Sequence, residues 1–167
     1  MHTDDTMPER TTTQRAKQQL RRGRSASTAA GEFVREEMDH IREGKHGARS
    51  AKQAIAIGLS KARRAGVPLR APKRGTAATK RAAANATKAG KRKRKPSPTR
   101  SRATLGALKR EPHRAASHRA LAAQAHTAAD RRGAGARKAA ARKAVRTKGP
   151  ALRKAAARKA AATRNRR

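Results

Sequence analysis

The sequence contains no cysteine and almost no aromatic residues. Its 167 residues include no Cys, Trp or Tyr and a single Phe, Phe33. Without cysteine, a disulfide framework and a thiolate metal site are both impossible. Without aromatic side chains, the chain lacks the platforms on which unpaired bases usually stack. These absences argue against a disulfide scaffold and against a typical single-strand-binding protein.

Acidic residues are scarce and unevenly placed. The chain has 46 Lys and Arg against 10 Asp and Glu, which gives a formal net charge of +36. Residues 1–43 contain eight acids and eight bases, so that only Glu111 and Asp130 oppose the positive charge of the remainder. A chain this basic repels itself and is typical of proteins that bind a polyanion, above all nucleic acid.

Long apolar segments are also missing. No apolar run approaches the roughly 20 residues that cross a membrane, and the first residues lack the hydrophobic core of a signal peptide. We therefore expect a cytoplasmic protein without a membrane partner. Alanine supplies most of the 35% hydrophobic residues. The large apolar side chains are too few for a core that includes the whole chain.

The large apolar residues that are present cluster in residues 31–69. Val34, Met38 and Ile41 recur at helical spacing, with Phe33 beside them, and predict a helix that ends at Gly44. Before this helix, residues 1–30 are polar and are expected to form a disordered arm.

A second helix is predicted to begin at Ser50. Ser50 and Gln53 match a capping box, Gly66 stands where a left-handed residue would end the helix, and Pro68 prevents its continuation. Its expected apolar face consists of small and branched residues: Ala51, Ala54, Ile55, Gly58, Leu59 and Ala62. The two helices together predict a short helical hairpin over residues 31–69.

Residues 45–68 carry the pattern KHG…SxKQAIAIGLSxARRAGxP. This pattern resembles a small uncharacterised bacterial domain found in short basic proteins of bacteria and their mobile elements. The resemblance covers about a quarter of the chain. It implies a discrete module and carries no established activity.

Residues 70–167 form a low-complexity tail rich in Ala, Lys and Arg. The octapeptide RKAAARKA occurs at residues 137–144 and again at residues 153–160. This composition resembles the Ala/Lys-rich tails of linker histones and of histone H1-like nucleoid proteins. Because like charges oppose isolated helices, we expect an all-α protein with a mostly disordered tail. Latent helices are expected at about residues 112–132, 134–148 and 150–164, where Pro and Gly mark the boundaries.

Basic residues of the tail are the candidate nucleic-acid contacts. Bases five residues apart rotate by about 140° on a helix, which suits several phosphate strands and does not suit reading a base sequence. Residues 97–100 are similar to the S/T-P-x-basic turns of histone tails, which can place a cation at the minor groove. The five bases of residues 91–95 fit a phosphate-binding patch and also a nuclear localisation signal. The candidates are Lys91, Arg92, Lys93, Arg94, Lys95, Arg100, Arg102, Arg137, Lys138, Arg142, Lys143, Arg153, Lys154, Arg158 and Lys159.

Catalytic and metal-binding motifs are incomplete. Glu37 and His40 match half of a carboxylate-bridged metal motif, but no second half follows, and neither an H-E-x-x-H pattern nor a P-loop occurs. We expect no enzyme, no cofactor, no metal and no small-molecule substrate. The acids of the first helix are expected to form a solvated face that pairs with bases. In the tail, His113, His118 and His126 are expected to face solvent, while His46 in the loop is expected either to contact a phosphate or to be a polar turn residue.

Two binding functions remain open. The first is a nucleoid-associated, histone H1-like protein that coats, bridges or condenses double-stranded DNA through phosphate contacts. The alternative is an RNA-binding or ribosome-associated basic protein. Because a two-helix hairpin cannot hide all of its large apolar residues from water, we also expect self-association through residues 31–69.

Overall fold

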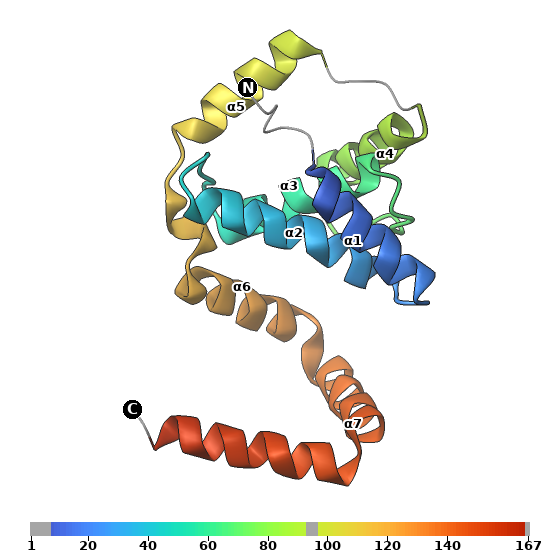
Figure 1. The fold of residues 1–167 in the computed structure, drawn as a ribbon, viewed down its shortest axis with the longest axis vertical. Helices are drawn as coiled ribbons and strands as arrows, with labels where there is room; N and C mark the ends of the chain where they lie inside the picture. Colours follow the sequence, from blue (N-terminus) through green and yellow to red (C-terminus); the bar gives the residue numbers. More distant parts are fainter. Residues whose placement is uncertain (1–7, 93–96, 166–167) are drawn as a thin grey trace. The chain divides into compact units, whose positions relative to one another are not determined.

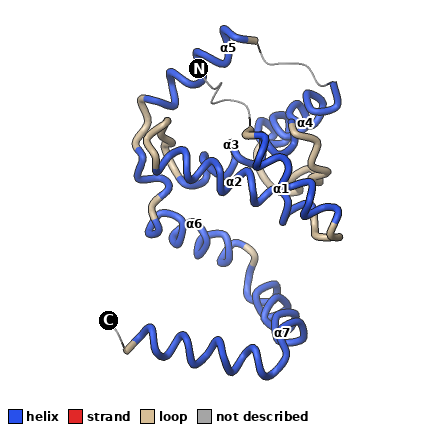
Figure 2. Tube along the Cα trace, in the orientation of Figure 1, coloured by secondary structure: helices blue, strands red, loops and turns tan. Residues whose placement is uncertain are grey.

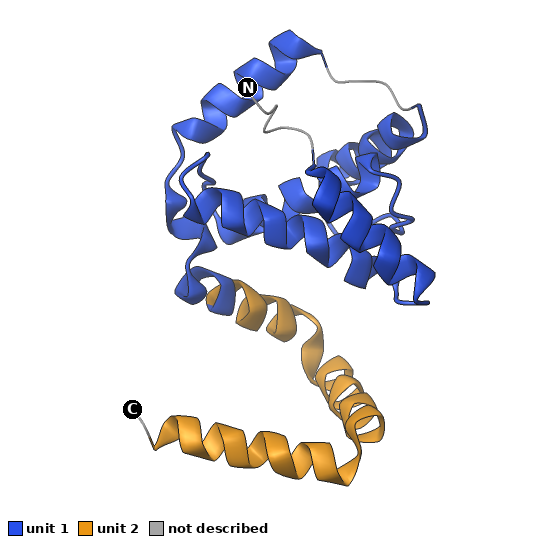
Figure 3. Ribbon diagram, viewed as in Figure 1, with its two compact units in different colours: residues 1–122 blue, residues 123–167 orange. Residues whose placement is uncertain are grey.

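The computed structural model describes residues 8–92 and 97–165, and every regular element within them is a helix (Figures 1 and 2). The elements are α1 (Arg10–Arg21), α2 (Ala26–Arg42), α3 (Ala51–Arg64), α4 (Ala77–Arg92), α5 (Pro98–Lys109), the 3-10 helix η1 (His113–Ala116), α6 (His118–Arg131) and α7 (Gly133–Arg164). For this part of the chain the predicted all-α class is confirmed. The chain divides into two compact units, residues 1–122 and residues 123–167 (Figure 3).

Helix α2 is longer than predicted at its start and ends where predicted. Ser25 caps the helix, since its Oγ accepts a hydrogen bond from the Thr28 backbone N–H at 3.2 Å. Gly44 follows the helix with a φ of 76°, and the next N–H, of Lys45, donates to the His40 carbonyl at 3.0 Å. This is the left-handed stop that glycine makes without steric cost.

Helix α3 begins and ends at the predicted residues. Ser50 Oγ accepts from the Gln53 N–H at 3.2 Å, while Gln53 Oε1 accepts from the Arg49 N–H at 2.8 Å. In a standard capping box the Gln53 side chain would accept from the N–H of the N-cap residue, Ser50. Here it accepts from the residue before the N-cap. After the helix, the Val67 N–H donates to the Ala62 carbonyl at 3.0 Å, which closes the turn at Gly66.

The helices α2 and α3 pack closely because small residues line their contact. A Cβ atom at Gly58 would lie 2.7 Å from the Cα atom of Val34. Ala54 and Ala62, one turn on either side of Gly58, are fully buried. The predicted hairpin is therefore present, with glycine at the point of closest approach.

The N-terminal arm differs from its prediction, because residues Arg10–Arg21 form α1 and pack on α2. Ala16 is buried in a cluster with Phe33, and Leu20 lies against the same cluster. At the edge of this contact, Arg15 Nε lies 3.3 Å from Glu32 Oε2. The 3.6-residue spacing of two modest apolar side chains supplies this amphipathic face.

Further segments of the chain cover the rest of the hairpin. Helix α4 packs on α3 and buries Ala86. The η1 residues Ala115 and Ala116 join the cluster of Met38 and Ile41. The first unit therefore extends to residue 122 and not to residue 69. The premise of the expected self-association, that two helices alone must hide these apolar residues, is thereby removed.

The acidic face of α2 is buried, and the expectation of a solvated face is wrong. Glu36 and Glu37 are 4% and 0% exposed, because α3 brings Lys61 over them and places its Nζ atom 2.9 Å from Glu37 Oε2. His40 is also buried, with its Nε2 atom 3.2 Å from Oε1 of the half-exposed Glu9. This hydrogen bond with His40 holds the pKa of Glu9 below its ordinary value.

The prediction of a mostly disordered tail is wrong, since residues 97–165 are largely helical. Alanine and the long straight-chain bases have high helix propensity, which is the local reason for these helices. One expected helix, residues 112–132, is instead divided into η1 and α6, where Ser117 Oγ accepts from the Ala120 N–H at 3.2 Å. Within the described ranges, no helix has both the length and the apolar character needed to cross a membrane.

Candidate nucleic-acid interface

Helix α7 is the longest helix and consists almost wholly of alanine and bases. It contains no Asp, Glu, Asn or Gln, and none of its residues is buried. At Gly149 the backbone leaves the helical region, with φ 63° and ψ 172°, and Pro150 starts the second half. The predicted division into residues 134–148 and 150–164 is therefore confirmed. Proline is tolerated in the first turn of a helix, because the N–H that it lacks would have no intrahelical partner there.

Basic side chains lie around most of the circumference of α7. With about 100° of rotation per residue, Lys138 and Arg142 lie near each other, while Arg137 and Lys143 lie on other sides. The pattern repeats in the second half, because the octapeptide recurs. All bases of the helix are exposed: Arg137, Lys138, Arg142, Lys143, Arg146, Lys148, Arg153, Lys154, Arg158, Lys159 and Arg164.

Two of the predicted contact residues also bind within the protein. An Arg137 guanidinium nitrogen lies 3.3 Å from Asp130 Oδ1 and donates to the Ala129 carbonyl at 3.4 Å. Arg153 Nε donates to the Gly149 carbonyl at 3.1 Å, which satisfies an acceptor at the kink. Because both side chains are at the surface, these contacts are weak and phosphate can displace them.

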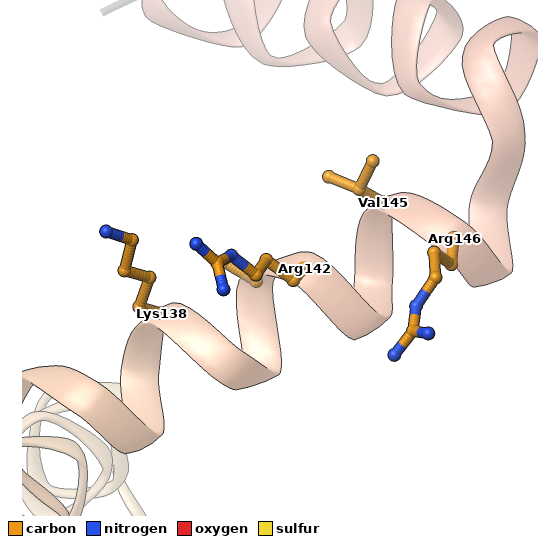
Figure 4. A pocket seen from close by; sticks show the side chains of 5 residues that line it. Lys138, Arg142, Val145 and Arg146 are labelled. Atoms are coloured by element: carbon orange, nitrogen blue, oxygen red, sulfur yellow. The ribbon is translucent and has the colours of Figure 1, made fainter.

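A shallow surface hollow lies along the first half of α7. We call it the α7 hollow; its lining residues are Lys138, Ala141, Arg142, Val145 and Arg146. Figure 4 shows Lys138 and Val145 projecting to one side of the ribbon, Arg142 lying along it between them, and Arg146 projecting toward the other side. Val145 and Ala141 give the hollow an apolar part, and Val145 is 45% exposed, so water reaches it. Such an open surface suits an anion that stays hydrated and cannot exclude water from a reaction.

Arg146 is a member of the α7 hollow that the sequence analysis missed. The candidate bases on α7 are those of the repeated octapeptide, and Arg146 lies just beyond the first repeat. The i, i+4, i+8 spacing of Lys138, Arg142 and Arg146 is the signal that identifies it, because such residues share one side of a helix.

The remaining candidate residues belong to the first unit. Lys91 and Arg92 are exposed in the last turn of α4, and Arg100 and Arg102 are exposed on α5. Residues 93–95 lie outside the described residues. Ser97 is the N-cap of α5 and Pro98 its first residue, so the four residues 97–100 start a helix and do not form the isolated turn expected from histone tails. The described bases of these two sets are thus exposed on helices of the first unit.

The expected histidine exposure holds in part. His113, His118 and His126 are exposed, as predicted. His46 is only 2% exposed, because its loop folds back against α2, and its prediction as a polar turn residue or phosphate contact is wrong. Comparison of the chain with protein-family models, with curated proteins and with solved structures finds no match.

Proposed function

We propose that the protein binds double-stranded DNA without sequence specificity, as a nucleoid-associated, histone H1-like protein. The observation that carries this proposal is α7, whose 32 residues contain eleven bases, no acid and no buried side chain. Phosphate is the natural counter-charge for such a helix, and release of counterions from DNA would drive binding.

The lack of specificity is supported by the residue types on α7. Asn and Gln, which read adenine in the major groove, do not occur in this helix. Each half of the helix rises about 24 Å, a length that matches about seven base pairs of duplex. Bases around the whole circumference suit contact with more than one duplex, and therefore bridging or condensation of DNA. Association with the nucleoid would follow from this binding.

A duplex is favoured over a single strand by the position of the one aromatic side chain. Phe33 is fully buried between α1, α2 and α3, so it cannot stack on a base. Proteins that bind single strands usually depend on exposed aromatic platforms. Structured RNA is the alternative partner, since its phosphates offer the same charge, and with it a role as an RNA-binding or ribosome-associated protein.

The proposal predicts a steep dependence of DNA affinity on salt. With about ten phosphates contacted, the plot of log K against log salt has a slope near −9. Fluorescence anisotropy with short duplexes of unrelated sequence measures this slope, and the affinities for those duplexes should agree within about threefold at each salt concentration. A slope shallower than about −3, or a strong preference for one sequence, would contradict nonspecific phosphate binding.

The choice between DNA and RNA needs a separate measurement. Crosslinking in the cell, followed by sequencing of the recovered nucleic acid, should return DNA spread evenly over the genome. Recovery of mainly ribosomal RNA would replace the DNA proposal with the RNA alternative. Competition between duplex DNA and duplex RNA of equal length gives the matched comparison in solution.

A further inference from the structure

Three potential metal ligands are buried together in the first unit. Glu37 and His40 lie on α2, and His46 lies in the loop that follows Gly44. The three residues are 0%, 4% and 2% exposed. Each offers one donor atom, and these atoms lie within 4.8 Å of one another. Nothing in nucleic-acid binding requires this arrangement.

Both ring nitrogens of His46 face acceptor oxygens. The Nδ1 atom lies 3.1 Å from the Gly47 carbonyl oxygen, and the Nε2 atom lies 3.3 Å from Glu37 Oε1. Both neighbours are acceptors, but a neutral imidazole has only one N–H. With the proton on Nδ1, the Nε2 lone pair faces a carboxylate oxygen in a buried place. Either a second proton or a metal ion between these two atoms removes that repulsion.

The contacts of His40 fit the same arrangement. Its Nε2 atom lies 3.2 Å from Glu9 Oε1, so a proton on Nε2 is well placed to be donated to that carboxylate. The buried Nδ1 atom then carries the lone pair. Histidines that bind a metal commonly donate their other ring N–H to a carboxylate or a backbone carbonyl. Glu9 and the Gly47 carbonyl are partners of these two kinds.

The balance of buried charge also favours a cation. Lys61 Nζ lies 2.9 Å from Glu37 Oε2 and 4.0 Å from Glu36 Oε1. Within the described residues, one ammonium group thus faces two buried carboxylates. Buried charge is costly unless it is compensated, so a further positive charge near Glu37 stabilises the fold. The ammonium group contacts Oε2, which leaves Oε1 for a metal.

We propose that Glu37, His40 and His46 form a zinc-binding site. The donors are Glu37 Oε1, His40 Nδ1 and His46 Nε2, and two imidazoles with one carboxylate are a ligand set that zinc accepts. Tetrahedral zinc holds its donors about 3.4 Å apart, so the three side chains draw closer together on binding. A water molecule completes the coordination.

Zinc at this position ties the loop after α2 to the helix itself. The same loop holds the end of α5 and the residue before η1, since the Gly47 N–H donates to the Leu108 carbonyl at 2.9 Å and the Ala48 N–H to the Pro112 carbonyl at 3.1 Å. The metal therefore stabilises the docking of η1 on the hairpin. This role is independent of the proposed DNA binding.

The test uses the full chain, purified free of metal and nucleic acid and titrated with Co²⁺ and then Zn²⁺. We expect saturation at one Co²⁺ per chain, with the intense visible absorption of four- or five-coordinate cobalt, and its loss when Zn²⁺ displaces the cobalt. At free zinc a hundred times Kd, the unfolding midpoint of the first unit should rise by about 10 °C or more.

Matched variants identify the ligands. His46→Gln and Glu37→Gln should each weaken Co²⁺ binding at least about tenfold, whereas the control His118→Gln/His126→Gln removes exposed tail histidines and should bind as the parent does. Circular dichroism of the metal-free variants checks that they fold. If they do not, the unaltered chain decides: a cobalt spectrum that stays octahedral, with no zinc-induced shift of the midpoint, overturns the site.

Discussion

Glu37 and Lys61 lie 2.9 Å apart and almost out of contact with water in the first unit, whereas every base of α7 in the second unit is exposed. In the first unit, charges of both signs meet inside the fold and contribute to its specific packing. On α7, charges of one sign face solvent and meet few acids. Part of the charge of the first unit is therefore paired inside the fold, whereas the positive charge of α7 stays available to bind a partner.

Alanine also has different roles in the two regions. Ala30, Ala54 and Ala62 are fully buried and let helices approach each other. On α7 the alanines are exposed and act through helix propensity alone. The stability of the first unit therefore depends on tertiary packing. The stability of α7 depends on helix propensity, so its unfolding is expected to be less cooperative than that of the first unit.

The largest expected effect comes from removing the buried ammonium group. Lys61→Met leaves Glu36 and Glu37 facing each other without their cation, and should lower the free energy of unfolding of the first unit by about 3 kcal/mol. The matched change Lys154→Met on α7 should leave that free energy unchanged. Urea unfolding of the full chain, followed through the amide resonances of α2 and α3, measures both. A Lys61→Met chain as stable as the parent would show that the buried pair does not stabilise the fold.

Removal of α7 tests whether the exposed bases of this helix account for DNA binding. A chain that ends at residue 132 loses the thirteen bases of residues 133–167. Its affinity for duplex DNA near physiological salt should fall by about 100-fold, and its log-log salt slope should become shallower by about five. Lys61→Met, which disturbs only the first unit, serves as the control and should keep the slope of the parent. An unchanged slope after truncation would assign binding to the bases of the first unit.

The smallest effects come from replacing one glycine by alanine in each of the two regions. Gly58→Ala places a Cβ atom against the backbone of Val34 and should destabilise the first unit by about 2 kcal/mol. Gly135→Ala meets nothing within 4 Å and should stabilise α7 by up to about 1 kcal/mol. Amide hydrogen exchange, read separately in α3 and α7, measures the two changes. Effects of the same sign would contradict the division into a packed unit and a propensity-driven helix.

The predicted helix ends were recovered because their signals are local. Ser50 caps α3, Gly44 and Gly66 adopt positive φ after their helices, and Gly149 with Pro150 divides α7. Each of these features depends on a few neighbouring residues and on backbone sterics. The positions of most candidate bases could be predicted for the same reason, since exposure is the default state of a charged side chain.

The burial of charge could not be predicted from local pattern. Glu36 and Glu37 have the spacing of a solvated helix face, and His46 stands in a polar loop. Their burial follows from contacts far apart in the chain, with α1 on one side, Lys61 of α3 on another and η1 beneath the loop. The expected disorder of the tail is wrong for a different reason, because the helix propensity of alanine and the long straight-chain bases outweighs the repulsion between like charges along these helices.

The sequence by itself determined the excess of positive charge, the helical class, most helix ends and the absence of thiol or aromatic chemistry. These properties depend on residue type and on neighbours within one or two turns. Only the tertiary structure decided which charges are buried, which segments cover the hairpin and that Glu37, His40 and His46 come together. The physical reason is that burial is a property of what packs against a residue, and here that packing joins residues separated by as many as 74 positions, as in the hydrogen bond from Arg42 to the Ala116 carbonyl.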